Sequence, residues 1–597
     1  MGAFGHALGT VLLMTQLASS GLHAPLPTPP QWHGASEHLI VGADNPWITP
    51  TEANGFTETP NYEQTRAWLQ RLDDASPMIH METFGRSPQG RDLLVVYATA
   101  NGTLDPAKPT LLVQAGIHSG EIDGKEATMM LLRDIAFGSK RHLLDHVNLV
   151  FVPIFNVDGH ERSGPFNRPN QRGPNNQGWR NTAQNLNLNR DYVKADAPEM
   201  RAMLGLLQRV HPDLYLDVHV TDGMDYQYDV TYTFQGRDGS FAHSPQIAHW
   251  LNAHYRPAVD AALTRNGHIP GDLVFAHNDR DLDQGLLGYP FTPRYSQAYG
   301  DIAHMATILI ENHSLKPFRQ RVLGTYVLIE ESLHQLSAHG RELRTATQAD
   351  QRARPATLPA GWQETAQPAG TRHFLPMQRE SYTSAASGAA ETHWTGRAAP
   401  AANVPQYGVE STITLQRPRA YWVPATKTDV IDRLRAHGIQ FETIDAPRTV
   451  DVDMLRLPDA HVAPGAPAEG RTRVMAGTPA RIHQQEWMPA GSIRVPTDQP
   501  LGDLAVIMLD PQSEDSLFAW GFFNEILQRV EYADGYVLAP LADQMLAADP
   551  ALRREFEARL AADPAFAADP DARLAWFYAR SSYVDARYQL YPVGIEP

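Results

Sequence analysis

Over residues 55–340 the apolar positions show two patterns, one typical of strands and one typical of helices. Short apolar runs bounded by Gly, Pro, Asn or Ser predict strands at 78–85, 91–99, 109–115, 147–154, 214–220 and 305–310. Apolar residues spaced three or four apart predict helices at 62–72, 125–137, 198–210 and 318–339. Strands that alternate with helices in this way indicate an α/β fold, with a mixed, mostly parallel sheet covered by helices on both faces.

The pattern changes after residue 340. Residues 341–366 are polar and rich in Ala, Pro, Thr and Gln, and we expect them to be a linker. Residues 367–597 predict a smaller, mixed α+β accessory domain. It has strand-like segments at 392–397, 419–423, 491–495 and 504–509 and helices at 427–437 and 517–530. The last fifty residues are helical and broken by Asp-Pro at 549–550, 563–564 and 569–570.

Composition narrows the class of protein. The 597 residues are enough for two or three domains, and the 42% hydrophobic and 20% charged fractions fit a folded globular chain. The net charge of −17, without a long basic run, argues against nucleic acid as a partner. Because the chain has no cysteine, it has no disulfides, and a metal site must use His and carboxylate ligands.

The first residues bear on the compartment. The segment 7–20, ALGTVLLMTQLASS, has the length of a signal-peptide core and is too short to span a bilayer. We expect residues 1–24 to be a signal peptide, cut after Ser19, Ser20 or Ala24, although a basic start is missing. The protein would then be exported to the periplasm or the exterior. We expect no membrane insertion, because no later segment is long and apolar enough.

One segment carries the strongest chemical signal. In 113–127, VQAGIHSGEIDGKEA, an apolar strand ends in a glycine-bearing turn with His118 and Glu121 three residues apart, and a helix follows. A neutral imidazole and a carboxylate are both good zinc ligands. The strand end would aim both side chains at one point.

The same spacing occurs at His339/Glu342 and at His483/Glu486. A bare His-x-x-Glu arises by chance about once in such a chain, so the context decides. His339 lies in a charged helical segment, and no apolar strand precedes His483. We therefore expect neither pair to bind metal.

Three later features are expected at the same edge of the sheet, because ligands collect beyond the carboxyl ends of parallel strands. His219 lies near the end of the predicted strand 214–220, and Glu311 directly follows the strand 305–310. The third is the loop 162–192, which has little periodicity and carries WRNT at 179–182 and NRDY at 189–192. A loop of this length in a compact domain is usually functional or disordered.

Together these residues resemble the zinc carboxypeptidase family, peptidase family M14, over about residues 55–340. The resemblance implies one zinc ion on His118, Glu121 and His219. It also implies that Arg180 polarises the scissile carbonyl, that Asn189 and Arg190 grip the C-terminal carboxylate of a peptide or protein substrate, and that Glu311 is the general base. The NVDG turn at 156–159 resembles the Asn-Pro-Asp-Gly of the family, and residues 367–597 resemble the extra region of large bacterial members.

The chain departs from the pancreatic-type members at two positions. Those members have Arg before the zinc-binding Glu, where this chain has Gly120, and an Asp that orients the first zinc His, where this chain has Asn187. The mobile substrate tyrosine of the family has three candidates here, Tyr289, Tyr295 and Tyr299.

Alternatives to a metallocarboxypeptidase stay open at this point. An N-acyl amino-acid or cell-wall peptide amidohydrolase of related fold would use the same His-x-x-Glu and distant His. A zinc-holding peptide-binding module would lack catalysis if Glu311 were displaced from the metal. We expect residues 367–597 to be non-catalytic, because they hold no ligand constellation apart from the pair at 483 and 486. The sequence leaves the oligomeric state open.

Overall fold

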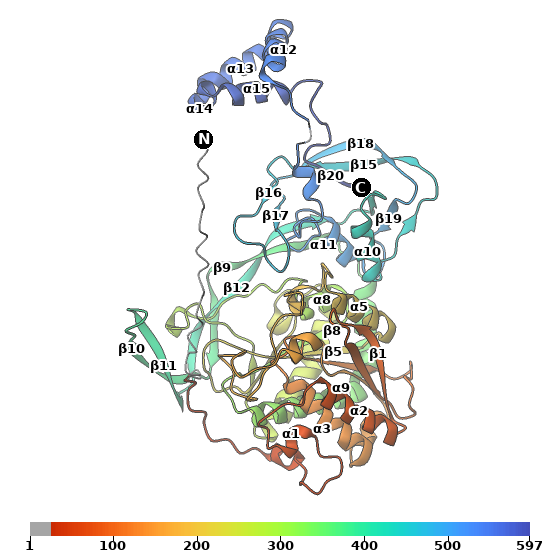
Figure 1. Ribbon diagram of the computed structural model, residues 1–597, viewed down its shortest axis with the longest axis vertical. Helices are drawn as coiled ribbons and strands as arrows, with labels where there is room; N and C mark the ends of the chain where they lie inside the picture. The colour runs from red at the N-terminus through yellow and green to blue at the C-terminus, as the bar shows by residue number, and fades with distance from the viewer. Residues whose placement is uncertain (1–24, 530) are drawn as a thin grey trace, which may run out of the picture.

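The computed structural model describes residues 25–529 and 531–597, so the predicted signal peptide at 1–24 lies outside the described residues. Figure 1 shows an α/β domain at one end of the molecule, a second β-rich part above it, and a small group of helices at the far end. Within the described ranges, every helix is either too short or too polar to cross a membrane.

An eight-stranded sheet forms the centre of the first domain, and it confirms the expected mixed, mostly parallel architecture. In spatial order its strands are β1 (Ile79–Arg86), β2 (Asp92–Ala98), β4 (Asn148–Val152), β3 (Thr110–Ala115), β5 (Leu214–Val220), β8 (Ala306–Asn312), β6 (Val230–Thr233) and β7 (Pro270–Asp272). The four central strands β4, β3, β5 and β8 are parallel. Antiparallel strands flank them on both sides.

Helices cover both faces of this sheet, as Figure 1 shows. They are α1 (Pro50–Ala53), α2 (Tyr62–Ala75), α3 (Asp123–Phe137), α4 (Val157–Glu161), α5 (Pro198–Val210), α6 (Pro245–Trp250), α7 (Arg256–Arg265), α8 (Ser296–Ile302) and α9 (Phe318–Arg352). Side chains of β3 alternate between the faces: Leu111 and Val113 join the core under α3 and α9, whereas Leu112 joins the core under α5. Burial on both faces explains why the central strands are continuous apolar runs.

The parallel strands end at a common edge, and this edge carries the candidate residues. After β3 the chain turns at Gly116, whose positive φ of 68° is a conformation that glycine adopts without strain. The turn leads to His118. In the ladder between β5 and β8, His219 lies beside Glu311. Three segments that are far apart in sequence therefore meet at one edge of the sheet.

The segment expected to be a linker is not irregular. Helix α9 continues to Arg352, and a strand begins at Thr357. The added turns are held to the domain because Leu343 is buried and because Asp350 accepts hydrogen bonds from the backbone N–H groups of Gln246 and Ile247. These contacts come from residues about a hundred positions away, so composition alone could not reveal them.

The C-terminal half begins with two long antiparallel ribbons. They are formed by β9 (Thr357–Phe374) with β12 (Ala402–Gln416) and by β10 (Met377–Thr383) with β11 (Ala390–Ala398). A six-stranded antiparallel sheet follows, in the order β14 (Glu442–Thr443), β19 (Ile493–Pro496), β13 (Ala420–Val423), β20 (Leu590–Glu596), β15 (Arg448–Arg456) and β18 (Ala480–Met488). A short pair, β16 (His461–Val462) and β17 (Val474–Met475), lies beside it.

The two halves share a hydrophobic core. Apolar residues of α5 pack in one continuous cluster with those of β13, of α10 (Thr428–Ala436) and of α11 (Gly502–Leu509). Polar contacts support this junction: Arg433 donates to the backbone oxygen of Lys194, and the Nε2 of His437 lies 2.9 Å from the backbone oxygen of Val193. The C-terminal half is therefore packed directly against the α/β domain.

Two expectations for this half are wrong. Residues 504–509, expected as a strand, belong to helix α11, which is buried on all sides. A short apolar run without periodicity does not distinguish a strand from a buried helix. The described part of the segment expected as a helix, residues 517–529, forms turns and the 3-10 helix η7 (Asn524–Leu527), and its large apolar side chains are buried in the shared core.

A helical appendage occupies the far end of the molecule (Figure 1). It consists of α12 (Gly535–Ala548), α13 (Pro550–Ala562), α14 (Pro564–Ala568) and α15 (Pro570–Tyr578). Each Asp-Pro step starts a helix, because the Asp side chain accepts backbone N–H groups of the first turn and Pro tolerates the first helical position. Its apolar side chains form a separate cluster around Phe556 and Trp576.

Candidate active site

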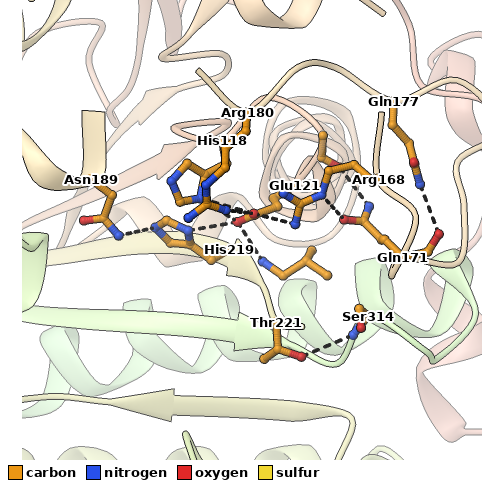
Figure 2. A network of polar contacts seen from close by, with 12 residues as sticks. His118, Glu121, Arg168, Gln171, Gln177, Arg180, Asn189, His219, Thr221 and Ser314 are labelled. Carbon is orange, nitrogen blue, oxygen red and sulfur yellow. Dashed lines mark hydrogen bonds and ion pairs between the residues drawn. The ribbon is translucent and has the colours of Figure 1, made fainter. Parts of the chain in front are cut away.

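Three side chains converge where β3 and β5 end. The Nδ1 atoms of His118 and His219 lie 3.2 Å and 2.9 Å from Oε2 of Glu121. All three side chains are buried, and their ligand atoms lie within 4.8 Å of one another. The Glu121 Oε2 also accepts the backbone N–H of Val220 at 3.1 Å. Figure 2 shows this arrangement.

The far nitrogen of each histidine has an acceptor that orients the ring. The Nε2 of His118 donates to Oδ1 of Asn187 at 3.0 Å, and the Nε2 of His219 donates to Oδ2 of Asp217 at 2.9 Å. A proton on Nε2 leaves Nδ1 as the nitrogen that can bind a metal. The sequence drew attention to Asn187 but missed Asp217, although strand alternation places Asp217 and His219 on the same face of β5.

Asp217 belongs to a longer buried network behind His219. Its Oδ1 accepts from Nε2 of Gln114 at 2.8 Å, and Oε1 of Gln114 accepts from the hydroxyl of Tyr215 at 2.8 Å. The Tyr215 hydroxyl in turn lies 2.7 Å from that of Tyr192. A chain of hydrogen bonds with every member paired fixes the position of His219.

The two histidines differ in their electrostatics. Burial, together with the nearby Arg180, lowers the pKa of His118 to about 4. Burial would also lower the pKa of His219, but the Asp217 and Glu121 carboxylates raise it well above its ordinary value. Glu121 is held ionised, because the nearby His118 and Arg168 lower its pKa against the opposing effect of burial.

These residues fit a zinc ion. Tetrahedral zinc with bonds of about 2.0–2.2 Å keeps its N and O ligands roughly 3.4 Å apart. The separations of 2.9 and 3.2 Å between the imidazole Nδ1 atoms and Glu121 Oε2 are close to this value. Three protein ligands would leave a fourth position open, which is typical of catalytic rather than structural zinc.

A loop arginine contacts the other oxygen of Glu121. Arg168 lies with one guanidinium nitrogen 2.7 Å from Oε1 of Glu121, and its side chain is 11% exposed. A Cβ at Gly120 would lie 2.7 Å from Cγ of Arg168, so a larger residue there would displace this side chain. Gly120 thus makes room for an arginine supplied by the loop; sequence reasoning noticed the glycine but missed Arg168.

Arg180 lies on the same side of the site. Its NH1 is 3.4 Å from Oε1 of Glu121, and its side chain is 39% exposed. The NVDG turn anchors this part of the loop, because Nδ2 of Asn156 donates to the backbone oxygen of Arg180 at 3.1 Å. Arg180 is thus fixed through its backbone while its guanidinium stays accessible.

Glu311 lies in the same cavity. The half-buried carboxylate sits beside His219 in the strand register. Loss of water around it, together with the carboxylates of Glu121 and Asp222, raises its pKa to about 8 in the metal-free protein. Perturbed acids of this kind are typical of functional sites.

Asn189 and Arg190 also line the cavity. The Oδ1 of Asn189 accepts the backbone N–H of Ser296 at 3.1 Å, and Arg190 donates to the backbone oxygen of Asn189 at 2.7 Å. The Arg190 guanidinium lies 4.2 Å from the centre of the Tyr295 ring. Aromatic stacking of this kind holds a guanidinium flat and leaves its edge free for an anion.

The cavity has a volume of about 180 Å³. Its lining includes His118, Glu121, Arg180, Asn189, Arg190 and Glu311 of the predicted site, together with the apolar or aromatic side chains of Leu273, Phe275, Tyr289, Phe291 and Leu309. Tyr289 and Tyr295 line the cavity and their hydroxyls lie 2.6 Å apart. Tyr299 does not line it; its hydroxyl lies 2.9 Å from Nδ1 of His437. The structure thus leaves two of the three candidate tyrosines in reach of a substrate.

The two other His-x-x-Glu pairs lie elsewhere. His339 and Glu342 sit on α9 beside His254, and these three form a more exposed group whose ligand atoms are also within 4.8 Å of one another. His483 contacts Asp453, whereas Glu486 contacts Arg587. The pair in the C-terminal half therefore points to two different partners.

Comparison with known proteins points to one family. The family described as zinc carboxypeptidase matches residues 65–268 of this chain. A probable carboxypeptidase 2 of Arthroderma benhamiae is 22% identical over 505 residues, which cover 79% of this chain and 88% of that protein. Carboxypeptidase A6 of Homo sapiens is 32% identical over 110 residues, which cover 17% of this chain and 24% of that protein.

Solved structures show a more distant likeness. A metallo-carboxypeptidase from Burkholderia cenocepacia is 17% identical, with a TM-score of 0.35; the match covers 46% of this chain and 69% of that one. The residues matched by the family, 65–268, contain His118, Glu121, His219, Arg180, Asn189 and Arg190 and end before Glu311.

Proposed function

This chain belongs to the zinc carboxypeptidase family and is a metallocarboxypeptidase, and we propose that it removes single residues from the C-terminal ends of peptides. The observation that carries the proposal is the content of one 180 Å³ cavity. Its lining includes His118 and Glu121, two of the three residues that could bind a metal ion. It also includes Glu311, whose pKa is raised, and Arg190, which could bind an anion.

In this proposal His118, Glu121 and His219 hold one zinc ion. Zinc in that position would act as a Lewis acid toward the peptide carbonyl and ease the deprotonation of water. The Nδ1 atoms of both histidines are available because each Nε2 carries its proton and donates it in a hydrogen bond to Asn187 or Asp217. Glu121 completes the set with an ionised carboxylate.

Glu311 would act as the general base. It takes a proton from the attacking water and delivers it to the nitrogen of the leaving residue. Arg180 would stabilise the negative charge that develops on the carbonyl oxygen, since its guanidinium is accessible while its backbone is anchored.

Arg190 and Asn189 would bind the free carboxylate of the substrate. A guanidinium that faces a neutral C-terminus loses a charge-assisted hydrogen bond of about 1.5–3 kcal/mol. We therefore expect at least roughly tenfold discrimination against amidated peptides. The signal peptide expected at residues 1–24 would place this activity outside the cytoplasm.

The side chain of the departing residue would contact the apolar residues that line the cavity. Leu273, Phe275, Phe291 and Leu309 offer hydrocarbon surface to this side chain. Burying an unpaired charge there would be costly. We propose that large apolar or aromatic C-terminal residues are preferred.

A peptide panel tests the proposal directly. The full-length, zinc-loaded protein is incubated with matched peptides that end in Phe, Leu, Lys or Asp, each with a free and an amidated C-terminus, and the products are identified by mass spectrometry. We expect release of single C-terminal Phe or Leu from the free peptides. Internal cleavage that ignores the terminal group, or turnover restricted to N-acyl amino acids, would instead indicate an endopeptidase or an amidohydrolase.

Glu311→Gln serves as the control for the chemistry. The variant should retain zinc and fold while its turnover falls by roughly two to four orders of magnitude, since the amide cannot accept the proton. Nearly full activity of this variant would place the base elsewhere. A wild-type protein that binds peptides and zinc but never cleaves would leave a peptide-binding module.

A further inference from the structure

The short turn 292–296 connects Asn189 and Arg190, together called the candidate carboxylate clamp, to the C-terminal half. This turn leads into helix α8, which begins at Ser296, and belongs to the α/β domain. On one side it contacts Asn189 and Arg190, and on the other it contacts Asp515. It is thus clamped between the two halves of the chain.

On the side of the cavity the turn makes two direct contacts. The ring of Tyr295 lies under the Arg190 guanidinium at 4.2 Å, and the backbone N–H of Ser296 donates to Oδ1 of Asn189 at 3.1 Å. The conformation of this turn therefore determines the position of the Arg190 guanidinium and the orientation of the Asn189 side-chain amide.

On the other side Asp515 holds the turn through three contacts. Its Oδ2 accepts the backbone N–H of Arg294 at 2.9 Å, and its Oδ1 accepts from Nε of Arg294 at 2.8 Å and lies 2.7 Å from NH2. Asp515 is 1% exposed. Burial alone would raise the pKa of Asp515, but the Arg294 guanidinium holds it below its usual value.

We propose that Asp515 is a positioning residue for recognition of the C-terminal carboxylate of the substrate, so that the C-terminal half completes the active site. The inference rests on the proposed function of Asn189 and Arg190. The path runs from Asp515 through Arg294 to the adjacent Tyr295 and Ser296, and from these to the clamp. The bond from the backbone N–H to one carboxylate oxygen and the ion pair of the guanidinium with the other oxygen fix the turn more tightly than either contact alone.

The neighbouring wall of the cavity is tied to the same half. The backbone N–H of Leu286 donates to the oxygen of Pro405 on β12, and the N–H of Gly288 donates to Oε2 of Glu364 on β9, both at 2.8 Å. These contacts hold the loop that carries Phe275, Tyr289 and Phe291 against the ribbon. Residues 367–597 are expected to be non-catalytic, and through Pro405 they still help to hold a wall of the cavity.

The alternative hypothesis is that the Asp515–Arg294 ion pair only joins the two halves of the chain and has no effect on Asn189 and Arg190. A matched ion pair separates the two hypotheses. Arg471 of the C-terminal half contacts Asp196 of the α/β domain at 2.7 Å and does not touch the turn 292–296. Breaking that pair removes another ion pair between the halves and does not alter the contacts of Asn189 and Arg190.

The test compares binding of two small probes, N-acetyl-phenylalanine and its amide, to the full-length protein in zinc-free and zinc-loaded form. In Asp515→Asn the Kd for the free acid should rise about tenfold, while the weaker Kd for the amide stays within about twofold. With peptide substrates the KM should rise by a similar factor and kcat should change little. Zinc content, measured separately, should equal that of the wild type.

Three further variants make the result decisive. Arg294→Gln should reproduce the loss even where Asp515→Asn folds poorly, Arg294→Lys should restore part of the affinity, and Arg471→Gln should leave both Kd values unchanged. Unchanged discrimination in folded Asp515→Asn or Arg294→Gln, or an equal loss in Arg471→Gln, would overturn the inference. Absence of discrimination in the wild type would instead contradict the proposed function.

Discussion

At the scale of single residues, the candidate metal centre depends on groups behind the ligands. His118 is oriented by the neutral amide of Asn187, whereas His219 is oriented by the carboxylate of Asp217. A carboxylate makes the imidazole a stronger donor to a cation than an amide does. The anionic support of this site therefore lies behind the second histidine.

Asp217→Asn should weaken zinc binding by roughly 10–100-fold without loss of the fold, because the amide keeps the shape but removes the charge. His219→Ala should lose zinc almost entirely, since a ligand is removed. Competition with a chromophoric chelator measures both. An Asn187→Ala variant is the control and should have the smaller effect; equal zinc affinity in Asp217→Asn and the wild type would contradict the argument.

The buried carboxyl group of Glu199 should make the stability of the protein depend on pH. Glu199 in the first turn of α5 is fully buried, and neither of its carboxylate oxygens has a hydrogen-bond partner within the described part of the chain. Burial raises its pKa from 4.5 to about 7. When folding raises the pKa of a carboxyl group, this group does not change the free energy of unfolding at a pH below its pKa in the unfolded state. The free energy of unfolding then falls as the pH rises from that value to the pKa of the group in the folded state.

Glu199→Gln should therefore stabilise the protein at high pH relative to low pH. Each pKa unit corresponds to about 1.4 kcal/mol, so the gain in unfolding free energy between pH 4 and pH 8 should approach roughly 3 kcal/mol. Urea unfolding at both pH values measures it. A gain that is the same at pH 4 and pH 8 would mean that Glu199 does not titrate in this range.

At the scale of elements, the loop 162–192 closes the site through Arg168. The contact with Glu121 is buried, and Gln171 supports it by accepting from Nε of Arg168 at 3.2 Å and donating to the backbone oxygen of Gly120 at 2.8 Å. Figure 2 shows this part of the network. In the metal-free protein Arg168 compensates the charge of Glu121.

Arg168→Gln should destabilise the metal-free protein by about 3 kcal/mol, because it leaves a buried carboxylate with less compensation. The loss should be smaller in the zinc-loaded protein, where the cation takes over this role. Thermal unfolding with zinc and with a chelator would show a larger zinc-induced shift in the variant. Arg162→Gln, which removes a loop arginine stacked on Trp179, is the control. Equal destabilisation in both states would refute this account.

At the scale of the whole molecule, the parts differ in how they relate to the cavity. The ribbons and the six-stranded sheet share a core and polar contacts with the α/β domain. The helical appendage has a core of its own, and Figure 1 places it at the end of the molecule opposite to the α/β domain. Deletion of the helical appendage should therefore affect the active site less than changes in the ribbons or the six-stranded sheet.

Replacing residues 533–580 with a short Gly-Ser linker should leave zinc content and peptide turnover within about twofold of the wild type, because the deleted helices share no apolar cluster with the other residues that the structure describes. Turnover of the same peptides with both proteins is the measurement. A large rise in KM would show that the appendage contributes to substrate binding.

Much of the fold follows from the local pattern. The helix at Pro198–Val210 and the strand at Leu214–Val220 have the bounds expected from periodicity, since each is long, regular and bounded by turn residues. Residues 504–509 were misassigned because a buried helix has no polar face to reveal its period. The ribbon β9–β12 was missed because its pairing joins residues far apart in sequence.

What the sequence by itself determined is the set of groups that local spacing brings together: His118 with Glu121 on one turn, His219 and Glu311 at strand ends, and Asn189 next to Arg190. Only the tertiary structure decided which partners these groups have. Arg168, Asp217 and Asp515 reach the site or its clamp through side-chain geometry and packing between distant segments. No local periodicity encodes such contacts, because they depend on how the elements pack, and packing is a property of the whole chain.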